Sequence, residues 1–143
     1  MTVTVVNEGR GVLCRRIDGV ASVANGGQGA MPNPEGVNLL ILRSTLVVHT
    51  PSTGAGNISI GVGATATTAA TDIINALAMN GAITGKAYNG HAMQNTAKTE
   101  ITAPAIWTPT SYVTITGSAS LVGLEASLYL EYIRIDEPPT SPV

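Results

Sequence analysis

The sequence is poor in charged residues, and this shortage limits the partners that the chain can have. Charged residues make up 11% of its 143 residues, less than half of the ~25% that is usual in globular domains. A surface completed by Thr, Ser, Asn, Gly and Ala repels other copies only weakly, which suits a subunit that packs against other subunits. The net charge is −2 and Arg15-Arg16 is the only adjacent basic pair. Nucleic-acid binding through phosphate neutralisation therefore has little support.

Aromatic residues are also scarce, because the chain has no Phe, a single Trp107 and four Tyr. The core must then be filled by Val, Ile and Leu, interleaved with small residues. Since β-branched side chains fit a pleated surface better than a helix, this composition favours β-sheet.

Cysteine is almost absent, and long apolar runs are missing. Cys14 is the single cysteine, which excludes an internal disulfide framework and a multi-cysteine metal site. The N-terminus has no basic segment followed by an apolar stretch, and no run approaches the ~20 residues that cross a bilayer. We expect a soluble protein made in the cytoplasm, with no membrane partner and one domain of ordinary size.

Residues 39–48 form the apolar stretch around which we expect the fold to be built. They hold seven large aliphatic side chains and one charge, and Pro34 and Pro51 flank them. Such a run predicts a strand that is buried on both faces, or nearly so.

Alternation of apolar and polar residues predicts further strands. They cover residues 2–6, 12–17, 20–24, 57–63, 111–116 and 127–135, and another at 99–105 is limited by Pro104. Asp18-Gly19 predicts a hairpin turn between the second and third of these. Residues 25–36 are predicted to form a loop or an arm. Residues 82–100 are predicted to form a long irregular connection with one edge strand and a turn at Asn89-Gly90.

Residues 71–79 are the exception, because Ile73, Ile74 and Leu77 follow the spacing of a short amphipathic helix. Thr71 or Asp72 would cap it and Asn80-Gly81 would end it. We therefore predict an all-β, two-layer antiparallel sandwich with one short helix and an extended N-terminal arm. Its parts are an N-terminal region (1–36), the sandwich (37–136) and a proline-rich tail (137–143).

No pattern in the sequence predicts catalysis or cofactor binding. Gly61-x-Gly63-x-x-Ala66 imitates a dinucleotide fingerprint, but the expected helix starts too late and no second βαβ unit follows, so close packing of layers explains the glycines better. His49 and His91 could be combined with Asp72 or a serine, yet no catalytic or metal-ligand spacing is present. We expect no enzyme activity, no cofactor and no metal.

Aromatic side chains leave open a glycan-binding module as an alternative. Trp107 and Tyr88 are the candidates for stacking on a sugar ring, as in many β-sandwich binding modules. An exposed aromatic patch would favour this interpretation, and a buried Trp107 would count against it.

Several segments between residues 41 and 135, in this order and spacing, resemble a group of tailed-bacteriophage virion proteins. The segments that carry the resemblance are Leu42-Arg-Ser-Thr-Leu-Val-Val48, Ser52-Thr-Gly-Ala55, Ile60-Gly-Val-Gly63, Asp72-Ile-Ile-Asn-Ala76, Leu121-Val-Gly123 and Tyr129-Leu-Glu-Tyr-Ile133. The resemblance implies a jelly-roll-like sandwich that decorates, or cements, the outside of a capsid as a homotrimer bound to the major capsid protein, with no catalytic activity. A tail or baseplate subunit on the particle surface is the related alternative.

The first 36 residues lie outside this resemblance, and they suggest how such a protein could attach. Residues Thr2, Val3, Thr4, Val5 and Val6 form a candidate capsid-contact arm, because an extended segment can add a strand to the edge of a neighbour's sheet. On this hypothesis, deletion of residues 1–24 should abolish attachment and leave the core folded.

Overall fold

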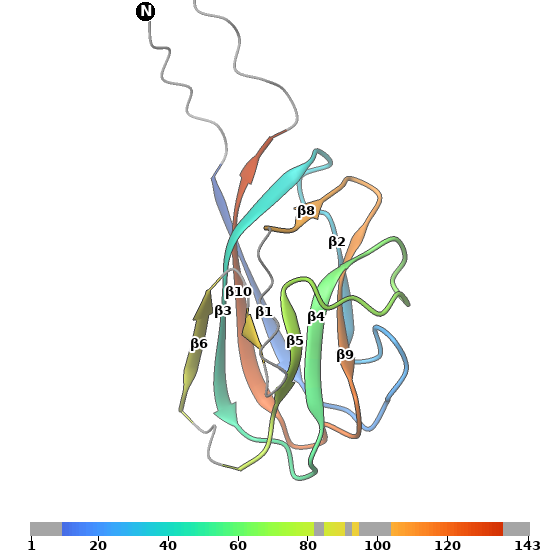
Figure 1. Ribbon diagram of the computed structural model, residues 1–143, viewed down its shortest axis with the longest axis vertical. Helices are drawn as coiled ribbons and strands as arrows, with labels where there is room; N and C mark the ends of the chain where they lie inside the picture. The colour runs from blue at the N-terminus through green and yellow to red at the C-terminus, as the bar shows by residue number, and fades with distance from the viewer. Residues whose placement is uncertain (1–9, 82–84, 91–92, 95–103, 136–143) are drawn as a thin grey trace, which may run out of the picture.

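The computed structural model describes residues 10–81, 85–90, 93–94 and 104–135, which form two β-sheets packed face to face (Figure 1). The arm at residues 2–6, His91 and the tail at 137–143 lie outside the described residues. Within them the chain is all-β, as predicted.

Each sheet has five strands. The first sheet has the order β1 (Gly11–Asp18), β10 (Glu125–Arg134), β3 (Leu39–Thr50) and β6 (Ala87–Gly90), and β8 (Ile106–Trp107) also pairs with β3. The second sheet has the order β2 (Gly29–Pro32), β9 (Tyr112–Gly117), β4 (Asn57–Gly63), β5 (Ile74–Ala78) and β7 (Met93–Gln94).

The strand pairs are nested along the chain, which is the topology of a jelly roll. With the two-residue strands β7 and β8 left aside, the first strand pairs with the last (β1 with β10), the second with the second-last (β2 with β9), and so on inward through β3 with β6 to β4 with β5. All four pairs are antiparallel. This nesting confirms the jelly-roll-like sandwich.

The core lies between the two sheets and is built from aliphatic side chains. Strand β3 contributes Leu39, Ile41, Leu46 and Val48, all nearly or fully buried, while most of the residues between them are half-buried or exposed. The predicted burial of this strand on both faces is therefore only partly correct. A register shift opposite Glu131 and Tyr132 changes the alternation, so that Ser44 faces the interior and Arg43 the outside.

The predicted strand at 20–24 and the hairpin at Asp18-Gly19 are wrong. Strand β1 pairs with β10 instead, and the chain leaves it without reversing onto it. The Gln28 side chain forms hydrogen bonds with backbone groups of this segment. Its Oε1 accepts from Val20 N, and its Nε2 donates to Val20 O and Ser22 O. Because these groups are already bonded locally, they do not join a ladder.

The predicted helix at 71–79 is also wrong. The Ile73 N–H donates to Ile60 O at 3.0 Å, and Ile74–Ala78 form β5 beside β4. A register shift interrupts this pair, and Ala76 takes a φ of 52° there. The bulge places Leu77 on the same side of the sheet as Ile74, and Ile73 is buried as well, which is why their spacing resembled that of a helix.

The described part of the N-terminal region, residues 10–36, contains a strand that its sequence did not indicate. Strand β2 lies within the predicted loop at 25–36 and pairs with β9. Both β1 and β2 therefore belong to the sandwich itself, and Ile17 and Met31 are core residues. Asn89-Gly90 ends the edge strand β6, and the described residues of the predicted strand 99–105, Pro104 and Ala105, are not in a strand.

Glycines in β4 allow a connection to cross close to the sheet, as the sequence predicted. A Cβ atom on Gly61 would lie 2.1 Å from Oδ1 of Asp72 and 2.7 Å from the backbone of Ala70. One on Gly63 would lie 2.6 Å from Cβ of Thr68. The Asp72 carboxylate uses this proximity to accept from Val62 N at 2.7 Å.

Substitution of Gly61 by Ala should therefore lower the free energy of unfolding by about 1–3 kcal/mol, because the added methyl forces the backbone apart. Gly54→Ala is the matched control, since its Cβ would meet only Ser120 O at 3.4 Å and the change should stay within about 0.5 kcal/mol. Urea unfolding of both variants tests this. Equal effects would contradict the proposed close approach.

Candidate interaction surface

The outer faces of the two sheets differ in how they are covered. Over the second sheet, the β1–β2 and β4–β5 connections meet, so that a Cβ on Gly26 would lie 1.9 Å from Ala66 O. The Gly26 N–H also donates to Oγ1 of Thr116 on β9 at 3.0 Å. Thr114, next to it on the outer face, is fully buried. This outer face is thus largely closed by the protein's own loops.

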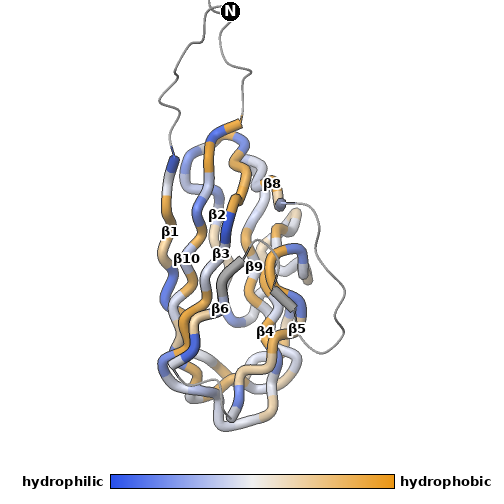
Figure 2. The backbone as a smooth tube through the Cα atoms, turned by 60° about the vertical axis from the view of Figure 1, so that its left-hand side comes forward, coloured by the Kyte–Doolittle hydropathy of each residue, from blue (hydrophilic) through white to orange (hydrophobic). Residues whose placement is uncertain are grey.

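In the described part of the chain, the strands β1, β10, β3 and β6 of the first sheet lie side by side (Figure 2). Their register sets the residues of the outer face in rows across the strands. The row nearest the end where β10 finishes holds Ile106, Leu40 and Ile133, which are successive cross-strand neighbours. The next row holds Val12, Glu131 and Arg43, and the third holds Cys14, Tyr129 and Thr45.

These three rows expose large apolar side chains. Exposed fractions are 61% for Val12, 51% for Ile106, 38% for Tyr129 and 36% for Ile135, which follows β10. We call this surface the apolar face and define it by Val12, Leu40, Ile106, Tyr129, Ile133 and Ile135. Contiguous apolar surface of this kind marks contact with another molecule more often than scattered residues do.

One ion pair interrupts the apolar face. Nε of Arg43 lies 3.9 Å from Oε2 of Glu131, and the side chains are 58% and 43% exposed. The two residues are directly opposite each other on β3 and β10.

The remaining rows of the first sheet are more polar, although one of them includes Val47. Arg16 pairs with Asp18 at 2.9 Å, Thr50 donates to Glu125, and His49 Nε2 lies 3.0 Å from Oγ of Ser127. The apolar face is therefore bounded at one end by hydrogen-bonding and charged groups.

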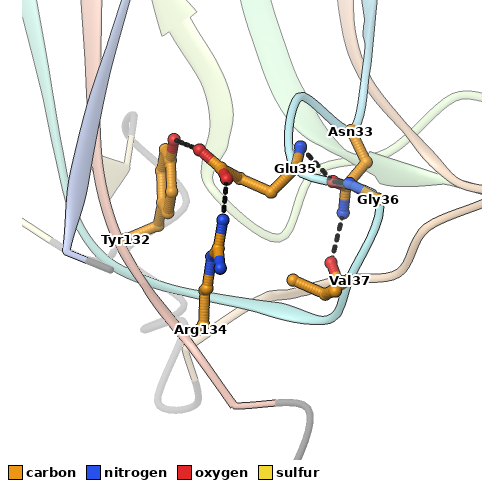
Figure 3. Close-up of polar contacts among 6 residues, drawn as sticks. All are labelled: Asn33, Glu35, Gly36, Val37, Tyr132 and Arg134. Carbon is orange, nitrogen blue, oxygen red and sulfur yellow. Dashed lines mark hydrogen bonds and ion pairs between the residues drawn. The ribbon is translucent and has the colours of Figure 1, made fainter. Parts of the chain in front are cut away.

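At the other end, the β2–β3 connection is held by the Asn33 side chain (Figure 3). Its Oδ1 accepts from the N–H groups of Glu35 and Gly36, both at 2.9 Å. Its Nδ2 donates to Val37 O and Trp107 O, both at 2.8 Å. A single side chain thus fixes the loop and the direction of Glu35.

Glu35 joins this loop to the end of β10. Oε1 accepts from the Tyr132 hydroxyl at 3.0 Å, and Oε2 accepts from Nη2 of Arg134 (Figure 3). The hydrogen bond from Arg134, followed by that from Tyr132, lowers the pKa of Glu35. Burial, with the bond to Glu35, raises the pKa of Tyr132. Both shifts favour the state in which a neutral phenol and a guanidinium share one carboxylate.

The glycan-stacking candidates do not form an exposed platform. Trp107 is fully buried, pairs with Leu39, and donates from Nε1 to Ser111 O at 3.1 Å. Tyr88 pairs with Leu46 and is half-buried against the core. Trp107 cannot stack on a sugar in this position, so this part of the prediction is wrong.

His49 and Asp72 are not brought together either, and His91 lies outside the described residues. His49 meets Ser127 on an open sheet face, whereas Asp72 belongs to the β4–β5 connection of the other sheet and binds Val62 N. In the described part of the chain, no cluster of three or more His, Cys, Asp or Glu could hold a metal ion. Gly61 and Gly63, whose spacing resembles a dinucleotide-binding fingerprint, instead allow the β4–β5 connection to pack close to β4.

Comparison of the chain with protein-family models and with curated protein sequences finds no match. Across the residues that the structure describes, no helix has the length and hydrophobicity needed to cross a membrane.

Protonation of Glu35 should weaken the link between β10 and the β2–β3 loop. Because its folded-state pKa is lowered, its contribution to stability is present above the unfolded value of about 4.3 and is lost as the pH falls through the folded value. Glu35→Gln should therefore lower the urea midpoint at pH 7, and the difference from the native chain should shrink as the pH falls below the unfolded value. A difference that stays constant with pH would contradict this role.

Proposed function

We propose that this chain is a structural virion protein that decorates the outside of a phage head and stabilises it. It is made in the host cytoplasm, assembles as a homotrimer and binds the major capsid protein. It carries out no catalysis. This proposal rests on the resemblance in sequence and on the surfaces described above.

The observation that carries the proposal is the open apolar face on a jelly roll of low charge. A chain that covers one sheet with its own loops and leaves the other exposed with Val12, Ile106 and Tyr129 has a surface suited to burial against other subunits. The jelly roll is a frequent fold of capsid proteins, although a fold does not determine a function.

The position of the chain ends supports attachment through the arm. Gly11 pairs with Tyr132, so β1 begins where β10 finishes, at the same end of the sandwich (Figure 1). The described chain therefore starts near the Glu35 link, and on this proposal the arm formed by Thr2, Val3, Thr4, Val5 and Val6 adds a strand to a sheet edge of the capsid protein.

A deletion shorter than residues 1–24 is needed to test this arm. Removal of residues 1–24 would also remove β1, which pairs with β10 along its whole length and supplies the buried Ile17. Such a chain would lose part of its core, so loss of attachment would have no clear meaning. The deletion should therefore end before Arg10.

Deletion of residues 2–9 should leave the thermal unfolding midpoint nearly unchanged, because β1 and its partners remain. Co-sedimentation with capsids that lack the decoration protein should fall to background. The full-length chain, treated in parallel, is the control. Undiminished sedimentation of the shortened chain would reject the arm as the attachment site.

Electron microscopy of intact particles tests the function itself. We expect density for this chain on the outer capsid surface, at symmetry axes. Density confined to the tail would move the chain to the tail or baseplate, and its absence from purified particles would refute a virion role.

A further inference from the structure

The ion pair on the apolar face has an unusual setting. Glu131 has Val12 beside it on β1 and Arg43 on β3, while Tyr129 and Ile133 precede and follow it on the same face of β10. Opposite charges therefore occupy the centre of an otherwise apolar surface. At 3.9 Å, with both side chains about half exposed, a pair of this kind contributes little to folding.

Such a surface is complementary to itself. It offers one cation and one anion side by side, and the same apolar side chains on every copy. When copies meet through it, Arg43 of one can approach Glu131 of the next, and the exposed valine, isoleucine and tyrosine side chains leave water. A strongly charged partner would find no matching excess of charge here.

We propose that the apolar face is the docking surface for a second copy of this chain, with Arg43 of one copy paired to Glu131 of the next. This deepens the proposed function, because it names the surface through which copies associate. In a three-fold ring each copy presents Arg43 to one neighbour and Glu131 to the other. The arm and the rest of the surface would then bind the capsid.

Charge exchange separates a pair between copies from a pair within one chain. Arg43→Glu and Glu131→Arg each place like charges at the contact, and each should weaken association of the purified chain by about tenfold or more. The combined variant R43E/E131R should associate like the native chain. Light scattering coupled to size exclusion, over a concentration series, measures this.

Mixing the two single variants is the decisive step. Neither variant alone can form the pair. In the mixture, the carboxylate introduced by Arg43→Glu faces the guanidinium introduced by Glu131→Arg on the other chain, so association should recover if the pair forms between copies. In a ring of three, one contact still joins two chains of the same kind, and recovery should be partial. Absence of any recovery would overturn the proposal.

Arg16→Glu is the matched control, because it makes the same change in net charge as Arg43→Glu on the same sheet but lies in the polar rows beside Asp18. It should leave association unchanged, and an equal loss would show a general charge effect and overturn the proposal. Circular dichroism melts confirm that each variant is folded. Because these association measurements contain no capsid, their result does not depend on whether the chain binds one. Recovery of association as a dimer would support this interface and contradict the homotrimer.

Discussion

The pairing of β10 along both of its edges is the interaction on which the rest of the structure depends. It joins β1, near the start of the described chain, to β3 in its middle, and so it closes the nested order of strands. Its inward residues Ala126, Leu128 and Leu130 are core residues. Its outward residues, Tyr129, Glu131 and Ile133, form the centre of the apolar face. One strand therefore serves the core and the candidate interface together.

The contrast between the two outer faces follows from where the connections run over each sheet. Small residues on the second sheet, such as Gly61 and Gly63, allow the loops to cross close to it, and hydrogen bonds accepted by Asp72 and Thr116 hold these loops. On the first sheet, larger side chains stand on the outer face and no described loop covers them. This asymmetry makes the outer face of the first sheet the candidate surface for contact with other molecules.

The sequence was sufficient for the strands with clear alternation and for the fold class, because a period of two is a local property. It misjudged residues 71–79, where a bulge at Ala76 gave Ile73, Ile74 and Leu77 a helical spacing. It also missed β2, whose glycine and proline read as a loop. The Glu35 link and the Arg43–Glu131 pair could not be found, since each joins residues that are far apart in the sequence and needs the strand register. A surface role for Trp107 was left open as an alternative because one sequence does not distinguish buried from exposed aromatics.

Oxidative footprinting of side chains, at protein concentrations below and above association, tests the central claim most directly. We expect the reactivity of Tyr129 and Ile106 to fall as copies assemble, while exposed Val23 and Val122 in the loops outside the apolar face stay reactive and Trp107 stays protected throughout. Unchanged reactivity of Tyr129 and Ile106, with protection appearing at Val23 and Val122 instead, would contradict it.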